Sequence, residues 1–363
     1  MPFILSVGTH LPPYYIPQKD AKVFVRNLFK DGYQDIDRLL QVFQNGQIEG
    51  RYFSVPLDWF NYDHSFQEKN HLYVQLAVKF GVEAIKKTLH APTFMKQSVD
   101  YETIDAIFLI SSSGISTPSI EARIMNQLPF SVHTKRIPIW GLGCGGGAAG
   151  LSRAREYCLA FPTANVLVLS IELCSLTFQR RDLSKSNLIG TSLFSDGVAC
   201  CLVCGDQSKL LSSSRLKRLP YLVDNCSTFM PDSEEVMGWR IENTGLHVVF
   251  SKSIPQIIEN WLKDPTVRFL QKHQLTVDDI RHFVAHPGGR KVLEAYQTIF
   301  GLDDAMLKPS SDVLKKYGNM SSATVLFVLK HFLQAKVNEN EIGLLAALGP
   351  GFSSEQVLLR WQS

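Results

Sequence analysis

The sequence predicts an α/β protein in which one structural unit occurs twice. Apolar segments of strand length alternate with segments of helical periodicity along the chain. Four of these elements recur in the same order in the second half, and a polar, serine-rich segment near residues 205–219 lies between the two sets. With 363 residues, 45% of them apolar, the chain can bury a large core. We therefore expect two related halves, residues 1–206 and 207–363, packed across a pseudo-twofold axis.

The repeated elements can be read directly from the sequence. The first is a buried strand and then a helix, "IDAIFLISSSG" with "SIEARIMNQL", repeated as "DDIRHFVAHPGG" with "RKVLEAYQTIF". The second is a glycine turn that opens a helix, "GLGCGGGAAGLSRAREYCLAF" and "KKYGNMSSATVLFVLKHFLQ". The third and fourth are strands, "NVLVLSIELC" with "EIGLLAALGPG" and "SDGVACCLVCG" with "SSEQVLLRW". Equivalent strand ends of two packed halves should lie close together, so the two glycine turns should face each other.

Composition and charge argue against several classes of protein. The net charge is only +3 and no dense Lys/Arg run occurs, which argues against nucleic-acid binding. The first residues, "MPFILSVGTHLPPYYIP", do not resemble a secretion signal, and no segment approaches the ~18 apolar residues of a membrane span. We expect a cytoplasmic protein. Its seven cysteines then argue against a disulfide framework, and the lone C-x-x-C at Cys201 and Cys204 is better explained as a buried strand than as a metal site.

Three polar residues follow strands or turns of the repeat. Cys144 lies in the first glycine turn, Asn319 lies in the matching turn of the second half, and His286 follows a strand of that half. A cysteine attacks as its thiolate, and both a helix amino terminus and a neighbouring histidine can lower a thiol pKa. The pattern therefore predicts one central site with Cys144 as a nucleophile of lowered pKa.

Two other readings of these residues explain less. Gly141, Gly143 and Gly146 spell G-x-G-x-x-G, and Glu172 ends a later strand, which partly fits a dinucleotide-binding turn. That reading leaves the three polar residues unexplained. The order Cys, His, Asn also occurs in papain-like cysteine hydrolases, but the C-G-S-C-W signature of those enzymes is absent.

Several stretches resemble the type III polyketide synthases, the chalcone-synthase-like branch of the thiolase superfamily, and most closely the bacterial alkylpyrone synthases. The stretches span most of the chain and are "STPSIEARIMNQL", "KRIPIWGLGCGGGAAG", "LCSLTF", "SNLIGTSLFSDG", "HPGGRKVLE", "GNMSSATVLFVL" and "LGPGFSSEQVLL". The combination of "HPGG" and "GNMSSA" distinguishes this family from the ketoacyl synthases that initiate fatty acid synthesis, which remain the alternative as single-condensation enzymes. The resemblance implies a duplicated, five-layer αβαβα fold.

The resemblance also implies roles for individual residues. Cys144 holds the growing chain as a thioester, His286 activates it, and His286 with Asn319 donates hydrogen bonds to the thioester carbonyl of malonyl-CoA. Phe194 matches a gating phenylalanine between a CoA tunnel and the reaction cavity, and the remaining substrate-binding candidates are Thr117, Cys174, Thr177, Gly190, Val248 and Ser321. Arg51 is a candidate for binding CoA near the tunnel mouth. No cofactor or metal is implied, because the coenzyme A thioesters are substrates.

Three positions depart from the plant enzymes of the family. Cys174 stands where they have a threonine, Val248 where they have a second gating phenylalanine, and Thr117 where they have a methionine that reaches into the partner subunit. The last two changes remove bulk and favour a long acyl starter over an aromatic one. The resemblance therefore implies a homodimer that condenses a long-chain acyl-CoA with malonyl-CoA to alkylpyrones.

Overall fold

The computed structural model describes residues 1–30, 32–33 and 35–363. Its strands are β1 (Phe3–His10), β2 (Tyr14–Pro17), β3 (Gly50–Phe53), β4 (Ala106–Ile110), β5 (Lys135–Ile139), β6 (Asn165–Leu173), β7 (Asp196–Cys204), β8 (Leu219–Phe229), β9 (Met237–Glu242), β10 (Gly245–Phe250), β11 (Ile280–Ala285), β12 (Ile342–Gly349) and β13 (Ser353–Gln362). Its α-helices are α1 (Gln18–Phe29), α2 (Ile36–Leu39), α3 (Gln41–Asn45), α4 (Phe66–Leu89), α5 (Ile120–Met125), α6 (Gly146–Ala160), α7 (Lys185–Leu193), α8 (Ile254–Ile257), α9 (Lys263–Gln271), α10 (Arg290–Phe300), α11 (Asp304–Tyr317) and α12 (Thr324–Gln334).

The strand order confirms the predicted duplication. Nine strands form one continuous sheet in the order β11-β12-β13-β8-β1-β7-β6-β4-β5. Reading outward from its centre, β1-β7-β6-β4 repeats as β8-β13-β12-β11, with the same parallel pair at each outer end. The two halves of the sheet are joined where Phe3 pairs with Tyr221. Each sequence repeat named above therefore forms the same element twice.

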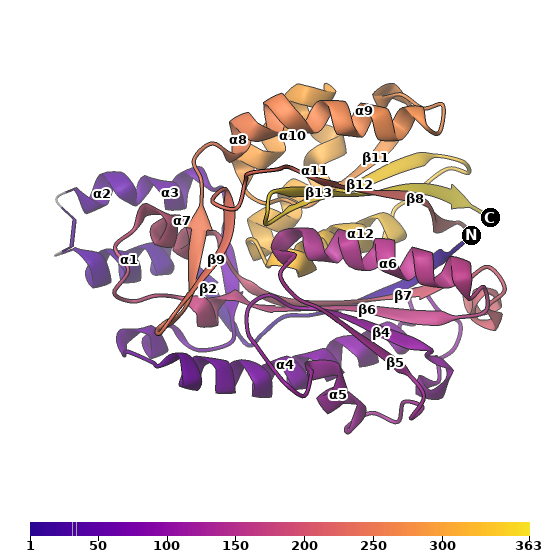
Figure 1. Cartoon of the computed structure of the whole chain (residues 1–363), viewed down its shortest axis with the longest axis horizontal. Coiled ribbons are helices and arrows are strands. Elements are labelled where there is room, and N and C mark those ends of the chain that lie inside the picture. Colours follow the sequence, from indigo (N-terminus) through magenta and orange to yellow (C-terminus); the bar gives the residue numbers. More distant parts are fainter. Residues whose placement is uncertain (31, 34) are drawn as a thin grey trace.

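The two halves stack as five layers. Figure 1 shows α4 and α5 covering the outer face of the first half-sheet, and α9, α10 and α11 covering the outer face of the second. Helices α6 and α12, which follow the two glycine turns, lie between the half-sheets. This is the αβαβα arrangement predicted from the resemblance. It places the amino ends of both central helices in the interior, where their turns meet.

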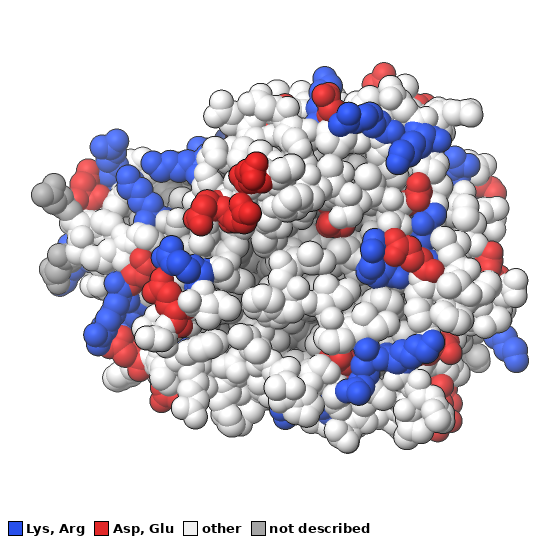
Figure 2. Space-filling view, in the orientation of Figure 1, with Lys and Arg blue, Asp and Glu red and all other residues white. Residues whose placement is uncertain are grey.

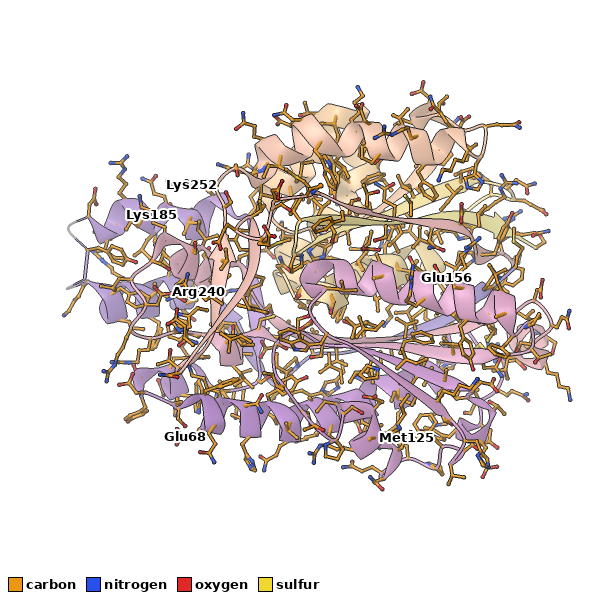
Figure 3. The ribbon with its side chains drawn as sticks, in the orientation of Figure 1. Glu68, Met125, Glu156, Lys185, Arg240 and Lys252 are labelled. Atoms are coloured by element: carbon orange, nitrogen blue, oxygen red, sulfur yellow. The ribbon has the colours of Figure 1, made fainter. Side chains whose placement is uncertain are left out.

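Two regions outside the repeat surround the end of the central helices. Helices α1 to α3 with the β2–β3 pair form one of them, and the β9–β10 hairpin forms the other, beside α7 (Figure 1). The hairpin and α7 are in contact, and the Ser186 hydroxyl donates to the Phe250 carbonyl at 3.3 Å. Figure 3 shows Lys185 at the start of α7 and Lys252 just past β10 at the same end of the hairpin, with Arg240 farther along β9.

The surface carries no dominant charge, and the C-x-x-C cysteines lie in the core. On the face drawn in Figure 2, basic and acidic side chains are interspersed around a mostly uncharged middle. No helix within the described ranges is both long and apolar enough to cross a membrane. Cys201 and Cys204 lie in β7 and are fully buried, which confirms the reading of the C-x-x-C as a buried strand.

Candidate active site

Cys144 lies where the first glycine turn enters α6. The turn is a 3-10 helix, Gly143–Gly145, and Gly143 has a φ of +44°, which favours glycine. A side chain at Gly147 would place its Cβ 2.2 Å from the Ser322 carbonyl oxygen of the other half. Likewise, a Cβ at Gly146 would lie 2.5 Å from Ile110. Gly147 therefore allows close packing of the two halves and Gly146 allows close packing of α6 on β4, so the dinucleotide reading of the motif is not needed to explain them.

His286 and Asn319 reach the same point from the second half. His286 immediately follows β11, and its backbone N–H donates to the Ala346 carbonyl at 2.8 Å. Asn319 follows α11 and Gly318, and its peptide group bonds on both sides to the chain around Phe194. The structure brings all three predicted residues to one buried cavity, which is lined by Cys144, Met237, Phe250, Ile254, His286, Gly288, Val292, Tyr296, Asn319, Leu348 and Phe352.

The side chains around the thiol are oriented by fixed backbone contacts. The Asn319 Oδ1 accepts from the Ser321 N–H at 2.8 Å, and its Nδ2 donates to the Gly288 carbonyl at 3.1 Å. The Cys144 Sγ is 4.0 Å from that Nδ2 and 3.7 Å from the Ser321 Oγ. Among the described residues, neither ring nitrogen of His286 has a hydrogen-bond partner. An imidazole with two free nitrogens inside a cavity is available to a substrate.

The predicted lowering of the Cys144 pKa is wrong for this structure. Burial raises the pKa of the Cys144 thiol to about 11, although Ser321 and Asn319 oppose the shift. Burial also lowers the pKa of His286 to about 3. Desolvation disfavours both charged forms and outweighs the helix terminus, whose effect is typically ~1 kcal/mol. Both shifts favour the uncharged forms, a thiol and an imidazole, so the thiol proton moves during the attack.

A second cavity contains most of the predicted substrate-binding residues. Cys174, Thr177, Gly190, Phe194 and Val248 all line it, and we call it the acyl cavity. Ser321 lies instead beside the thiol. Thr117 is exposed on the loop between β4 and α5 and lines neither cavity.

Phe194 stands between the two cavities. It lines the acyl cavity, and its ring lies 6.0 Å from the ring of Phe250, which lines the catalytic cavity. On the acyl side it lies 6.1 Å from the ring of Trp239. With the side chains as placed, the cavity volumes are about 50 Å³ on the acyl side and about 20 Å³ around Cys144. A water needs roughly 10–15 Å³ of such volume, so substrates require these aromatic side chains to move.

Much of the acyl cavity wall consists of residues that no sequence motif indicated. Phe24 and Val25 come from α1, Phe60 from the segment after β3, Phe178 from the segment after β6, and Trp239 from β9. These side chains, most of them aromatic, line the same cavity as the small residues Cys174 and Val248. The available signal was the amphipathic pattern of residues 18–29, but no local pattern indicates which cavity that helix covers.

Arg51 does not lie at a surface opening. It is 1% exposed, lies in β3 and lines the acyl cavity. Its guanidinium donates to the Thr191 carbonyl at 2.6 Å and to the Phe194 carbonyl at 2.8 Å. The suggested placement of Arg51 near the tunnel mouth, for binding CoA, is therefore wrong. Arg51 lies in a short strand, and the local sequence gave no indication that this strand is enclosed.

Glu172, the acid that ends β6, takes part in a buried network behind the thiol. It is fully buried, and its carboxylate accepts from the Ser322 hydroxyl and, at 3.1 Å, from the Ser112 N–H. The Ser322 hydroxyl also lies 2.6 Å from that of Ser170. Burial raises the pKa of Glu172 from 4.5 to about 7. No nucleotide-facing role is needed to account for this acid.

The raised pKa of Glu172 predicts a pH-dependent stability. Because the folded state binds this proton more tightly than the unfolded state, the stabilisation is complete below pH 4.5 and is lost as pH rises through about 7. In Glu172→Gln the amide stays neutral, its oxygen accepting from Ser112 and its NH₂ donating to Ser322. The unfolding free energy of the wild type, relative to this variant, should fall by on the order of 3 kcal/mol between pH 4 and pH 8.

Urea unfolding of both proteins over that pH range measures the difference. Burial raises the pKa of Asp196 to about 6, but Asp196 is present in both proteins, so its contribution cancels in the difference between their unfolding free energies. A difference that stays constant with pH would contradict the assignment.

Comparison with known proteins assigns the chain to a family. The chalcone and stilbene synthase N-terminal domain matches residues 2–207, and the C-terminal domain of the same family matches residues 221–362. A putative chalcone synthase of Bacillus subtilis is 52% identical over 363 residues, covering 100% of this chain and 99% of that protein. The 1,3,6,8-tetrahydroxynaphthalene synthase of Streptomyces peucetius is 33% identical over 99% of this chain and 93% of its own.

Solved structures give the same result. The 1,3,6,8-tetrahydroxynaphthalene synthase of Streptomyces coelicolor, described as a bacterial type III polyketide synthase, superposes with a TM-score of 0.91 at 28% identity and 99% coverage of both chains. The fold and the family matches define an acyl-transferring condensing enzyme. The chain belongs to the chalcone and stilbene synthase family and is a type III polyketide synthase that uses malonyl-CoA.

Proposed function

We propose that the protein condenses a long-chain fatty acyl-CoA starter with malonyl-CoA and releases alkylpyrones. The observation that carries the proposal is the acyl cavity beyond Phe194, whose wall is mainly aromatic and aliphatic. Burying a chain in such a cavity gains roughly 0.8 kcal/mol per CH₂ group. A relative at 27% identity, from Mycobacterium tuberculosis, is named an alpha-pyrone synthesis polyketide synthase-like protein, which supports the product class.

In the proposed reaction, Cys144 is loaded first. As the Cys144 sulfur attacks the acyl-CoA carbonyl, a nitrogen of His286 takes the thiol proton, because both groups are neutral beforehand. The carbon–sulfur bond to CoA breaks, and the CoA thiolate recovers that proton and leaves. The acyl chain, now a thioester on Cys144, extends past Phe194 into the acyl cavity.

Chain extension then uses His286 and Asn319 as donors. The carboxylate of malonyl-CoA leaves as CO₂, and the electron pair it leaves behind forms an enolate, whose oxygen accepts hydrogen bonds from the His286 ring N–H and the Asn319 Nδ2. The enolate carbon attacks the thioester carbonyl, and the Cys144 sulfur leaves. The lengthened chain is then a thioester of CoA, and it returns to Cys144 by the same loading step before each further cycle. Finally an enol oxygen of the chain attacks the terminal thioester carbonyl, which closes a pyrone, and the CoA thiolate takes up the enol proton and leaves.

Mass spectrometry of the products tests this proposal. The purified protein is incubated with malonyl-CoA and a series of acyl-CoA starters from acetyl to stearoyl, without added metal or nicotinamide. Pyrones that carry the starter's alkyl chain are expected. A single condensation product would instead indicate a ketoacyl-synthase-like enzyme, and products made from malonyl-CoA alone would overturn the long-chain starter.

Val248→Phe should shorten the preferred starter. Val248 lies across the hairpin from Trp239, and its Cγ1 is within 3.2 Å of where a Gly190 Cβ would be, so a larger ring there fills the acyl cavity. We expect the kcat/KM optimum to move to a chain several carbons shorter, with a loss of up to a few-fold per CH₂ no longer accommodated. The neighbouring Val249→Phe, on the opposite face of the strand, is the matched control. Identical length profiles for Val248→Phe and the wild type would contradict the cavity assignment.

We also propose that the enzyme is a homodimer. Ile115 and Trp140 are large apolar side chains that are 43% and 49% exposed, and the Trp140 indole donates to the Gly114 carbonyl, which places them together beside Thr117. Such a group of exposed apolar side chains supports a subunit interface. It would bring Thr117 to the partner chain.

A further inference from the structure

Arg51 is a buried cation that the proposed reaction does not use. It is 1% exposed, and its hydrogen-bond acceptors are all neutral: the Gln18 Oε1 at 2.9 Å and the carbonyls of Thr191 and Phe194. The guanidinium carbon lies over the Phe53 ring, 5.1 Å from the ring centre. A buried charge is costly unless its surroundings compensate it, so this placement calls for an explanation.

Two features oppose the cost of burying this charge: the nearby Asp196 carboxyl, which counteracts the lowering of the Arg51 pKa by burial, and the carbonyls at the end of α7. The last carbonyls of a helix lack partners within the helix and carry its negative dipole end. Here four successive carbonyls are paired from outside the helix. Arg51 donates to Thr191 and Phe194, the Gln18 side chain donates to Ser192, and the Asn319 N–H donates to Leu193.

The same contacts join the acyl cavity to the catalytic residues. Phe194, whose carbonyl Arg51 holds, carries the ring between the two cavities. Ser195 donates its N–H to the Asn319 carbonyl at 2.8 Å, so the segment held by Arg51 is paired with Asn319 on both sides. The opposite side of Arg51 packs on Gly318, where an added Cβ would lie 2.8 Å from the Arg51 Cγ. Arg51 thus lies between the Phe194 segment and the turn that carries Asn319.

We propose that Arg51 is a positioning residue of the condensation reaction, which holds Phe194 and Asn319 in register so that the Asn319 amide faces the thiol. This inference rests on the proposed function, in which the Asn319 amide stabilises the enolate. One guanidinium bridges two carbonyls of the Phe194 segment. A lysine has a compact ammonium on a flexible stem, and it cannot reproduce the fixed, planar arrangement of donors that the guanidinium provides.

The test separates loading from decarboxylation in Arg51→Met and Arg51→Lys. Loading of Cys144 by a starter acyl-CoA, read by mass spectrometry of the intact protein, does not need the Asn319 donor in the proposed scheme. Decarboxylation of malonyl-CoA does need it. For Arg51→Met we expect kcat for decarboxylation to fall about 100-fold, the size of effect that a displacement of about 1 Å can produce. KM for malonyl-CoA should stay within about three-fold of the wild type, and the loading rate should fall much less than the decarboxylation rate. The decarboxylation rate of Arg51→Lys should lie between those of the wild type and Arg51→Met.

The matched control is Arg155→Gln. Arg155 is a partly buried arginine that, like Arg51, donates to backbone carbonyls, those of Leu222 and Val223; it also pairs with Asp224 at 3.3 Å, and it lines neither cavity. It should lower the melting temperature without separating the two activities. If Arg51→Met does not fold, the ratio of the decarboxylation rate to the loading rate in Arg51→Lys tests the inference instead. Equal losses of loading and decarboxylation in the Arg51 variants would overturn the inference. A wild type that forms no condensation product would instead overturn the proposed function.

Discussion

Replacement of Cys144 by alanine is expected to abolish chain extension while leaving a slow decarboxylation of malonyl-CoA. Among the described residues that line the catalytic cavity, Cys144 is the one with a thiol, so no other side chain there can carry the acyl chain as a thioester. His286 and Asn319 should remain in place, since the polar contacts of the Cys144 sulfur with Asn319 and Ser321 are weak, at 3.7 Å or longer. Acyl-enzyme and pyrone should both fall below detection, while CO₂ release from malonyl-CoA persists.

Cys158→Ala is the control for this variant. Cys158 is a buried thiol in the same helix, α6, and faces the Ala164 carbonyl rather than a cavity. It should keep pyrone formation near the wild-type rate. Pyrone formation by Cys144→Ala at more than a few per cent of that rate would mean that another group carries the chain. Complete loss of CO₂ release would show that the sulfur also takes part in decarboxylation.

Asn319→Asp should lower malonyl-CoA decarboxylation by ~10²–10³-fold at pH 8, the usual effect of removing one donor to a developing oxyanion. The new carboxylate can still accept from the Ser321 N–H, as the Asn319 Oδ1 does at 2.8 Å, but it cannot donate. Burial should raise the pKa of this carboxyl, because Asn319 is fully enclosed. As the pH falls, the protonated acid regains a donor, and the rate should partly recover. The wild type should not show that recovery.

Steady-state CO₂ release between pH 5 and pH 8 measures this effect, together with loading of Cys144 by a starter. Asn126→Asp, at an exposed residue of the first half, controls for the added charge. Loading should change much less than decarboxylation. A variant that loses loading but decarboxylates normally would assign Asn319 to the first step instead of the second.

The duplication could be derived from the sequence because it depends on local patterns. Each repeated strand is a short apolar run, and each central helix begins at a glycine turn, so their order alone indicates two equivalent halves. That symmetry placed the turns of Cys144 and Asn319 opposite each other, and the structure brings both to one cavity with His286. The regions outside the repeat, such as α1 and the β9–β10 hairpin, have no second copy, and their positions could not be inferred this way.

The ionisation of the site could not be derived from the sequence. A helix amino terminus and a nearby histidine both favour a thiolate, and these are visible as a motif. Burial favours the neutral thiol and prevails here, with the pKa of Cys144 raised to about 11 and that of His286 lowered to about 3. Desolvation depends on every chain segment that encloses the group, including the distant hairpin residues Met237 and Phe250.

Arg51 shows the same division between sequence and tertiary structure. Arginine side chains are mostly exposed in proteins, and the sequence suggested a surface role for Arg51 in binding CoA. Only the tertiary packing of β3, which contacts α11 and β7, places its guanidinium at the carbonyls of Thr191 and Phe194. By itself, the sequence determined the duplicated fold, the family and the meeting of the three polar residues, because these depend on motifs and internal symmetry. Cavity walls, proton positions and the buried arginine were decided by the tertiary structure, because they depend on which distant segments exclude water.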